Sequence, residues 1–486
     1  MRYSMLVYLT NMGKTLLEAA QYLPTTDDKK LQRDLLKNGK QMIRQIKSML
    51  ERHSGDLRTT RPLDRLHLIE QYWGEPEHAG ELEVQMEDLI LHLPEEVSYQ
   101  VRAVFFAELG EKWDAMESVY EFMRDDPRFD PVVVRTPVFR VVNQNGKQKS
   151  EVIYKDFLMP MGIPSLGYSK YSLEKDCPDL AFISQPYESC TTTDFWPETI
   201  AKYSRLVYLP YFLPSIVLKD YPNVLCQMPV YNLSWKVIGS GEKHYKYYQK
   251  YSRHGGANML VTGVPKTDPI IRAKENGMPL PAGWEPIKGK KVFLWNSWFS
   301  INVSSLQFFD KIFDWFQQHP DCALIWRPHP MTETVTKIYF PERAGYLQEC
   351  KRRVKAAPNT VLDEETSFLA AFVYSDAQIS DHSSMMQQYL PMDKPLLWFG
   401  IPAFGATGEE FISTQWMERA NGAADILRFL DRVYKGVDSN AELRKTICRQ
   451  DMPLLDGRCG ERVCEALWEA LHIEDGLTQA HKKEVW

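Results

Sequence analysis

From residue 101 onward, short apolar runs alternate with amphipathic helical segments, and this alternation constrains the fold more than any other feature. Such a rhythm is typical of parallel sheets whose strands are joined by crossover helices. The runs are RAVFFA (102–107), PVVVRT (131–136), LAFIS (180–184), RLVYLP (205–210), WKVIGS (235–240) and NMLVTG (258–263). The sequence therefore predicts a parallel-sheet α/β lobe over residues 99–275.

The alternation begins again after the proline- and glycine-rich segment ENGMPLPAGWEPIKGKK (275–291). Proline and glycine interrupt regular structure, so we interpret this segment as a linker. The second set of runs is KVFLWN (291–296), ALIWR (323–327), TVLD (360–363), AQIS (377–380) and PLLWF (395–399). We expect an α/β fold with a second lobe over residues 285–455, a cleft between the lobes, and a C-terminal helix and tail over residues 456–486.

Residues 1–98 have a helical pattern instead. The segment DLLKNGKQMIRQIKSMLERH (34–53) places Leu36, Ile43 and Ile46 on one face, and ELEVQMEDLILHL (81–93) predicts a further helix. No residue in this region suggests chemistry. We expect a packing or association module, through which the chain could form a homo-oligomer.

The composition excludes several classes of protein. The chain has 58 basic and 64 acidic residues and a net charge of -6, which does not favour a nucleic-acid binder. Its eight cysteines include no CxxC pair, as in a reduced intracellular protein. No convincing signal peptide and no apolar run of about 18 residues is present. We expect a cytoplasmic protein, and peripheral attachment to the inner face of the membrane stays open.

Polar residues follow three predicted strands of the second lobe, where ligands bind in open parallel sheets. They are Asn296 and Ser297 after the first strand, Arg327 and His329 after the second, and Ser380, Asp381, Ser383 and Ser384 after the fourth. Serine hydroxyls and the free N–H groups at a helix start suit an anion, and an arginine fork suits phosphate. The alternatives are a simple helix cap and an Arg-His pair that satisfies local carbonyls. The prolines beside His329 predict a rigid loop.

The combined motifs LIWRPHP and SDHSSMMQQYLPMDKPLLWF resemble the CDP-glycerol glycerophosphotransferase family, whose members carry RPHP and SDxSS…DKP segments. VTGVPKTD resembles the family's G-x-P-[RK]-x-D segment, and LLDGRCGERV resembles its terminal D-G-K-x-x-E-R helix. The resemblance covers about residues 100 to 470. It implies a GT-B fold, with the nucleotide donor on the C-terminal lobe and the acceptor approached from the N-terminal lobe.

The resemblance also implies roles for single residues. Arg327 and His329 would bind the donor diphosphate, and both would be catalytic residues. Further donor contacts would come from Asn296, Ser297, Ser380, Asp381, Ser383 and Ser384. Gly263 and Asp268, in the segment at the end of the first lobe, would lie on the acceptor side.

One departure from the family concerns the base that activates the acceptor. Better known members have a Trp-His-Gly segment in the first lobe, and this sequence has FISQPYESC (182–190) in the corresponding place. Glu188 is then the nearest candidate base, with Gln185 and Tyr187 as acceptor contacts. An ordinary loop carboxylate is the alternative, and His244 and His254 are other candidates.

The expected reaction is attack by an acceptor hydroxyl on the glycerol-bearing phosphorus of CDP-glycerol, with release of CMP. The acceptor would be a glycan, a lipid-linked primer or a polyol-phosphate chain of a teichoic acid or other cell-surface polymer. No Asp-x-Asp metal triplet is present, so we expect no required cofactor and no protein-bound metal, although a diphosphate can recruit Mg2+. Two rivals remain: a GT-B glycosyltransferase or epimerase that uses a nucleotide sugar, and a catalytically inactive GT-B scaffold.

Overall fold

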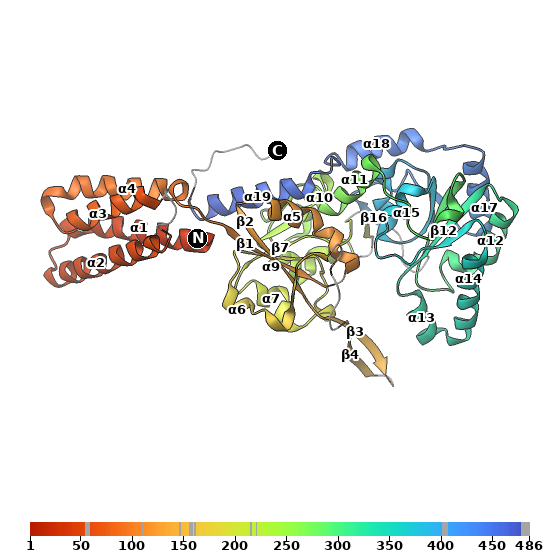
Figure 1. Cartoon of the computed structure of the whole chain (residues 1–486), viewed down its shortest axis with the longest axis horizontal. Coiled ribbons are helices and arrows are strands. Elements are labelled where there is room, and N and C mark those ends of the chain that lie inside the picture. The colour runs from red at the N-terminus through yellow and green to blue at the C-terminus, as the bar shows by residue number, and fades with distance from the viewer. Residues whose placement is uncertain are drawn as a thin grey trace.

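The computed structural model describes residues 1–53, 59–108, 110–144, 147–154, 159, 162–213, 216–219, 221–400 and 407–477. Three parts follow one another along the long axis of the molecule (Figure 1): a helical bundle and two α/β lobes. The first lobe lies between the bundle and the second lobe.

The predicted helical N-terminal region is confirmed as a bundle of α1 (Tyr3–Tyr22), α2 (Lys29–Glu51), α3 (Thr60–Tyr72) and α4 (Ala79–Glu96). Its core contains Leu6, Ile43, Ile46 and Leu66, each with no exposed surface. Trp73 fits beside the backbone of Gly39, where a Cβ atom would lie 1.9 Å from the indole ring. The spacing of apolar residues along α2 therefore predicts its buried face correctly.

The bundle is joined to the first lobe through the start of α1. The backbone N–H of Tyr3 donates to the carbonyl of Gln100 at 2.9 Å. The hydroxyl of the same tyrosine donates to Asp475 Oδ2 at 2.7 Å, and Arg2 forms an ion pair of 2.6 Å with Asp176. These contacts attach the bundle directly to the body of the lobe.

The first lobe contains a parallel sheet in the order β10-β9-β7-β6-β1-β2-β5. Its strands are β1 (Val101–Ala107), β2 (Phe129–Arg135), β5 (Leu166–Gly167), β6 (Leu180–Ile183), β7 (Arg205–Tyr208), β9 (Lys236–Gly239) and β10 (Met259–Val261). The helices that pack against it include α5 (Glu117–Asp125), α7 (Pro197–Ile200), α9 (Pro229–Leu233), α10 (Glu242–Tyr251) and α19 (Cys459–Glu474). Helices α5 and α19 share one core with the sheet, and α7, α9 and α10 share the other.

The second lobe contains a parallel sheet in the order β13-β12-β11-β14-β15-β17. Its strands are β11 (Lys291–Ser297), β12 (Cys322–Pro328), β13 (Thr360–Leu362), β14 (Ala377–Asp381), β15 (Leu396–Phe399) and β17 (Glu418–Ala420). Its helices include α12 (Phe309–Gln318), α13 (Thr332–Tyr339), α14 (Ala344–Ala356), α15 (Leu369–Tyr374), α16 (Ser384–Gln388), α17 (Ala423–Tyr434) and α18 (Ala441–Asp451).

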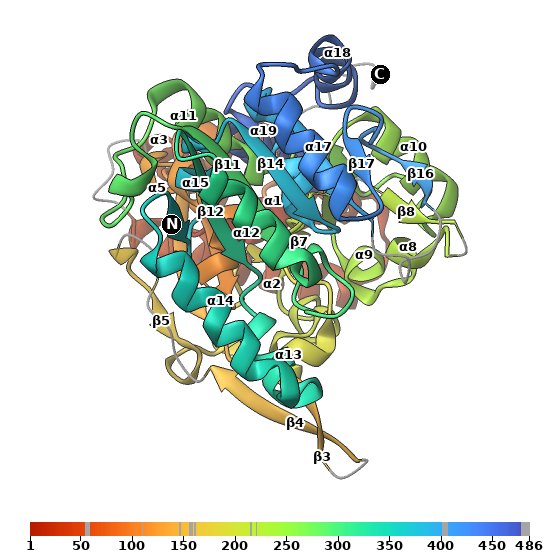
Figure 2. The same cartoon turned by 90° about the vertical axis from the view of Figure 1, so that its right-hand side faces the viewer.

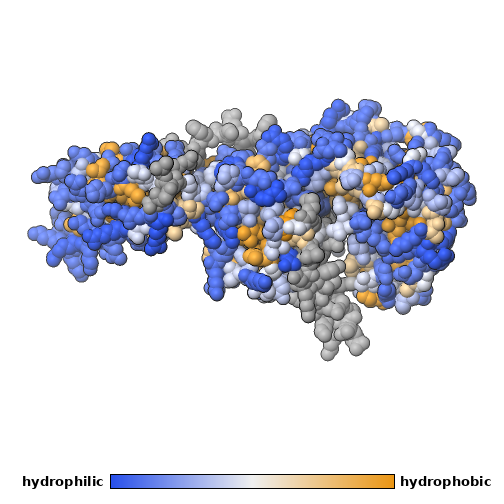
Figure 3. Space-filling view, in the orientation of Figure 1, coloured by the Kyte–Doolittle hydropathy of each residue, from blue (hydrophilic) through white to orange (hydrophobic). Residues whose placement is uncertain are grey.

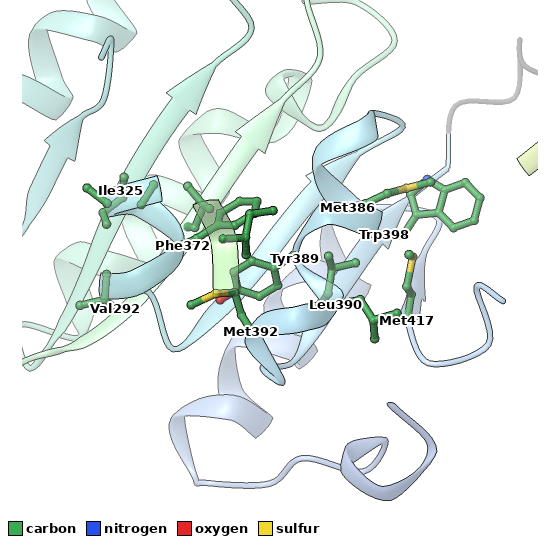
Figure 4. Packing of buried hydrophobic residues seen from close by; sticks show 14 of the residues in the cluster. Val292, Ile325, Phe372, Met386, Tyr389, Leu390, Met392, Trp398 and Met417 are labelled. Carbon is green, nitrogen blue, oxygen red and sulfur yellow. The ribbon is translucent and has the colours of Figure 1, made fainter. Parts of the chain in front are cut away.

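The two faces of the second sheet have separate cores. Aromatic residues of α12 and apolar residues of α14 and α17 cover one face. On the other face, Figure 4 shows Phe372, Tyr389 and Met392 close together. The predicted linker joins this core, because Trp284 and Ile287 are each only 3% exposed. The proline- and glycine-rich segment that we interpreted as a linker is therefore packed against the second lobe.

Two features of the lobes were not predicted. Strands β3 (Val138–Gln144) and β4 (Lys147–Tyr154) form an antiparallel hairpin that projects from the first lobe (Figures 1 and 2). Strand β8 (Ile216–Leu218) of the first lobe pairs antiparallel with β16 (Thr407–Glu410) from the second half of the chain. The pairing of β8 with β16 links the two lobes along one edge.

The face of the molecule seen in Figure 3 is largely polar. Figure 3 shows hydrophilic residues over the bundle and the lobes, with apolar residues scattered in small groups. In the part of the chain that the structure describes, no helix has the length and hydropathy needed to span a membrane.

Candidate functional site

The strand ends that carry the polar motifs are adjacent in the second sheet. Strand β11 lies between β12 and β14, and Asn296 is in register with Arg327 on one side and with Ser380 on the other. Parallel strands end at the same edge of a sheet, so the three motifs meet there. The predicted convergence of these segments is therefore observed.

Asn296 connects the motifs by hydrogen bonds. Its Nδ2 donates to the backbone carbonyl of Arg327 at 3.3 Å. Its Oδ1 accepts from Ser383 Oγ at 3.0 Å and from Ser380 Oγ at 3.5 Å. Since Asn296 is only 5% exposed, this amide acts as a fixed bridge between β12 and β14.

The His329 imidazole is held as a neutral group. Its Nδ1 accepts the backbone N–H of Met331 at 3.1 Å, so its proton is on Nε2. Burial lowers the pKa of His329 to about 4. The backbone N–H of His329 donates to the carbonyl of Ser297 at 3.0 Å, which fixes the loop against β11. The ring can therefore offer an Nε2–H hydrogen bond to a ligand.

Arg327 is engaged inside the lobe. Its Nη1 donates to Asp363 Oδ2 at 2.7 Å, and its Nη2 donates to the carbonyl of Glu365 at 2.8 Å. Further bonds reach the carbonyls of Thr366 and Ser367. In this arrangement the guanidinium holds the loop that follows β13, as in the alternative of satisfied local carbonyls. A contact with phosphate would require some of these bonds to be exchanged.

Asp381 and Ser297 hold parts of the lobe in place. Asp381 has no exposed surface, and its two oxygens accept the backbone N–H groups of Trp298 at 2.7 Å and Ser305 at 3.0 Å. Burial raises the pKa of Asp381 to about 6, while the two N–H donors act in the opposite direction. Ser297 Oγ accepts the indole N–H of Trp326 at 3.1 Å. Both side chains are used in supporting the loop and strand beside the site.

The segment after β14 begins a short helix. Ser383 occupies its N-cap position without a side-chain capping bond, and α16 extends only over Ser384–Gln388. Ser384 is exposed, whereas Ser383 is half-buried and bonded to Asn296. Of the two hydroxyls, that of Ser383 is thus the one tied to the motifs of the neighbouring strands.

The DKP segment after α16 forms a turn. Asp393 has a left-handed backbone with φ 56° and accepts a hydrogen bond of 3.0 Å from Arg444. Lys394 donates to the carbonyls of Phe372, Val373 and Ser375 at the end of α15. Burial lowers the pKa of Lys394 to about 8. The segment therefore connects α16 to β15 and caps α15.

In the first lobe, the candidates after β6 lie close to other polar groups. Glu188 is half-buried and is hydrogen-bonded to Glu198; burial and this neighbour both raise the pKa of Glu188. Gln185 is 7% exposed, and Tyr187 is 45% exposed. The carboxyl end of β6 thus carries a buried amide, a paired carboxylate and an exposed phenol.

The other first-lobe candidates serve the interior of the fold. Both oxygens of Asp268 accept backbone N–H groups at the start of α19, those of Cys459 at 3.0 Å and Gly460 at 2.8 Å. Gly263 has φ +78°, and a Cβ atom there would lie 2.6 Å from the sulfur of Cys459. Asp268 has no exposed surface. These two residues form the contact between the terminal helix and the end of the first lobe.

The two alternative histidines are also committed to the fold. His244 is 1% exposed, and burial lowers its pKa to about 4. It stacks on Phe411 with ring centroids 4.8 Å apart. The Nε2 atom of His254 lies 2.9 Å from the carbonyl of Asn232. In these contacts both imidazole rings are bonded to or packed on other parts of the fold, and neither contacts the motifs of the second lobe.

Three polar residues at the strand ends of the first lobe were missed. Glu108 follows β1, Lys112 lies in the turn after it, and Tyr211 follows β7. The strand-end rule applied to the second lobe would have found Glu108 and Tyr211 if it had been applied to this lobe as well. Within the described residues, no group of three metal-ligating side chains is close enough to hold a metal ion.

Comparisons with known proteins give a family match for one part of the chain and a common fold for the two lobes. Residues 229–469 match the family model for CDP-glycerol:poly(glycerophosphate) glycerophosphotransferase. The structure is similar to S. aureus MnaA solved with UDP, with a TM-score of 0.52 and 10% identity over 80% of this chain and 100% of that chain. No curated protein matches the chain at a significant level.

Two further solved structures have the same architecture. A putative UDP-N-acetylglucosamine 2-epimerase from Listeria monocytogenes has a TM-score of 0.51 and 10% identity, over 80% of this chain and 100% of that chain. A variant of the wall teichoic acid polymerase TagF soaked with CDPG has a TM-score of 0.50 and 12% identity, over 86% of this chain and 98% of that chain. The predicted GT-B-like fold with two parallel-sheet lobes is therefore confirmed.

Proposed function

Over residues 229–469 the chain belongs to the CDP-glycerol:poly(glycerophosphate) glycerophosphotransferase family, and from this premise we propose that it transfers glycerol phosphate from CDP-glycerol. The acceptor is a hydroxyl group of a glycan or polyol-phosphate chain of a teichoic acid or related cell-surface polymer, and CMP is released. The observation that carries the proposal is the Asn296 bridge, which holds the RPHP and SDHSS segments at one sheet edge.

The proposed donor site uses neutral and charged hydrogen-bond donors. His329 donates from Nε2 to a phosphate oxygen, and the Ser383 hydroxyl can turn from Asn296 to another. Arg327 supplies positive charge nearby, either in direct contact with the phosphate or from its position against the loop that follows β13. Negative charge moves onto the CMP leaving group during transfer, and fixed donors stabilise it without large reorganisation.

The chain needs no cofactor for this proposed chemistry. Mg2+ could accompany the diphosphate of the donor, since phosphate oxygens are good ligands for that ion. We propose that the enzyme works on this acceptor as a peripheral protein at the inner face of the cell membrane. Association through the α1–α4 bundle would give a homo-oligomer.

A donor screen tests the proposal. Purified protein is incubated with CDP-glycerol or UDP-N-acetylglucosamine and with a short poly(glycerol phosphate) oligomer, and the released nucleotide is quantified. We expect CMP release from CDP-glycerol that depends on the oligomer. UDP release would favour the alternative of an enzyme that uses a nucleotide sugar. This alternative is included in the screen because the fold is similar to that of MnaA. No turnover of either donor would favour an inactive scaffold.

A His329→Ala variant links the activity to the site. Loss of the Nε2–H donor is expected to lower kcat by roughly 10²–10³-fold, as for other donors that stabilise developing charge. The matched control is His319→Ala, because His319 packs on Trp315 in the same lobe, away from the motifs. Equal activity of both variants would contradict the proposed donor site.

A further inference from the structure

The first lobe has a polar cluster at its own strand ends, which we name the β1–β6–β7 cluster. It consists of Glu108, Lys112, Gln185, Tyr187 and Tyr211. Strand β6 lies between β1 and β7, so the segments that follow these strands are neighbours. Ligands of open parallel sheets bind at such an edge. Glu108, Lys112 and Tyr211 lie outside the family motifs described above, and Gln185 and Tyr187 belong to the segment that stands in the place of Trp-His-Gly.

Glu108 lies at the centre of the cluster. It is 8% exposed, and Lys112 Nζ donates to its Oε2 at 3.3 Å. The Gln185 side chain forms a hydrogen bond with the same carboxylate. Burial raises the pKa of Glu108, and both partners act in the opposite direction. The carboxylate is therefore desolvated but held in one place by a cation and an amide.

Gln185 provides a second observation. Its amide group bonds Glu108, but its Oε1 has no hydrogen-bond partner among the described residues. A buried amide oxygen without a donor is costly in a folded protein. A ligand hydroxyl would supply that donor, and it would then lie beside the Glu108 carboxylate.

The outer part of the cluster is lined by groups that suit a polyol. Lys112 Nζ lies 4.9 Å from the centre of the Tyr211 ring. The Tyr211 hydroxyl is hydrogen-bonded to Tyr187, which is 45% exposed. Phenol hydroxyls and an ammonium group at the rim offer hydrogen bonds to hydroxyl and phosphate oxygens.

The cluster lies at the junction with the second lobe. Asp114, in the turn after Glu108, forms an ion pair with Lys266. The Lys266 ammonium lies 5.6 Å from the centre of the Phe368 ring, which follows the loop held by Arg327. On the β7 side, Leu213 is buried in a core formed mainly by the second lobe. The segments that follow Glu108 and Tyr211 thus reach the junction between the lobes that also includes the loop held by Arg327.

We propose that Glu108 is the catalytic carboxylate that accepts the proton of the acceptor hydroxyl, and that Gln185 orients this hydroxyl. This inference rests on the proposed function. The acceptor oxygen forms a bond to the glycerol-bearing phosphorus as its proton passes to Glu108. The bond from that phosphorus to the bridging oxygen breaks, and CMP leaves with the electron pair. The acceptor class is a polyol end with a free hydroxyl.

Glu188 fits this role less well. Its carboxylate is hydrogen-bonded to Glu198, an exposed acid, and burial together with this neighbour raises the pKa of Glu188. Proton uptake by such a pair reflects both groups. Glu108 instead faces a cation and an amide donor, both of which favour the ionised form that a base requires.

The test compares Glu108→Gln with Glu188→Gln and with Glu174→Gln, a substitution on the exposed surface of the same lobe. Calorimetry measures CDP-glycerol binding, and CMP release with a poly(glycerol phosphate) oligomer gives kcat across pH 4 to 9. A Glu108→Asp variant tests rescue by a shorter carboxylate, and thermal unfolding checks that each variant folds.

We expect Glu108→Gln to keep its Kd for CDP-glycerol within about twofold and to lose about 10²–10⁴-fold in kcat, the range of general-base catalysis. The wild-type rate should rise with pH as the carboxylate ionises, and this acidic limb should vanish in Glu108→Gln but persist in Glu188→Gln. Wild-type kcat in Glu108→Gln, or loss of the limb in Glu188→Gln, overturns the inference and leaves the proposed function standing. A wild type that neither binds CDP-glycerol nor releases CMP overturns both.

Discussion

At the scale of single residues, the second lobe fixes its polar groups before any ligand binds. The Met331 N–H selects the tautomer of His329, and Asn296 holds Ser383. Arg327 and Asp381 use their hydrogen bonds on neighbouring loops. A motif residue can therefore either bind a ligand or hold the loops around the site. The hydrogen bonds that its side chain already makes show which of these roles it has.

The ionisation of His329 should respond to the donor. Burial lowers its pKa to about 4 in the free protein, whereas a bound diphosphate favours the imidazolium and should raise the pKa. Titration followed by ¹⁵N NMR of labelled histidine measures the pKa and the tautomer with and without CDP-glycerol. A proton on Nδ1, or a pKa near 6.5 in the free protein, would contradict the arrangement described.

Asp381→Ala should destabilise the second lobe. The variant removes the acceptor of two backbone N–H groups, at Trp298 and Ser305, and leaves these donors buried. We expect a loss of about 3 kcal/mol in the free energy of unfolding of this lobe, measured by urea denaturation. CDP-glycerol binding should weaken as well, because Phe299 in the released loop contacts His329. Glu349→Gln, at an exposed site, is the control and should change stability by less than about 0.5 kcal/mol.

At the scale of helices and strands, the lobes are linked by segments whose sequence does not stand out. The β8–β16 pair joins the two halves of the chain, and the stacking of His244 on Phe411 connects α10 to the segment that follows β16. The β3–β4 hairpin projects from the same lobe. These strands are short, and apolar residues do not recur regularly along them. Their pairing is therefore decided by contacts with distant parts of the chain and cannot be read from the local sequence.

The contact between α10 and Phe411 should weaken at low pH. The folded pKa of His244 is about 4, against an ordinary value of 6.5. The unfolded chain therefore takes up a proton between pH 6.5 and 4 that the folded chain does not, and stability falls as pH falls through this window. The expected loss is about 3 kcal/mol.

A His244→Phe variant tests this pH dependence. The ring stacking is retained, and the titrating group is removed. The slope of Tm between pH 6.5 and 4 should become shallower than in the wild type, even if Tm at pH 7 drops because Ser240 loses an acceptor. Identical slopes would show that His244 does not contribute.

The strand-end rule explains which parts of the site could be predicted. Strands β11, β12 and β14 are apolar runs with polar ends, so the meeting of Asn296, Arg327 and Ser383 follows from local sequence and parallel topology. The partners of Arg327 are on a loop after β13, and no local pattern indicates them. The cap that Asp268 forms on α19 likewise joins residues that are far apart in the chain. Long-range hydrogen bonds decide these roles, and periodicity does not encode them.

At the scale of the whole molecule, α19 connects the end of the chain to the first lobe. After α18 packs on the second lobe, Val463, Cys464, Leu467 and Leu471 of α19 enter the core of the first sheet. Figure 1 shows this helix running along the first lobe beside α5. Its start is capped by Asp268, and its end meets Tyr3 through Asp475. One helix thus contacts both the junction of the lobes and the root of the bundle.

Asp268→Ala should loosen this connection. The variant removes the acceptor of two N–H groups and the negative charge at the helix start. A loss of about 1–2 kcal/mol is expected for a cap. Hydrogen exchange should show faster exchange of the first amides of α19, including Gly460. Glu469→Gln, at an exposed position of the same helix, is the control. Unchanged exchange in Asp268→Ala would contradict the capping role.

The return of α19 to the first lobe has a consequence for synthesis on the ribosome. Phe105, Met123 and Phe182 belong to a core that includes α19 residues, so this side of the first sheet stays incomplete while the second lobe is being translated. Exposed apolar surface of that kind favours aggregation and chaperone binding. The nascent first lobe should therefore need protection until residues near 471 have emerged, although its own strands were made hundreds of residues earlier.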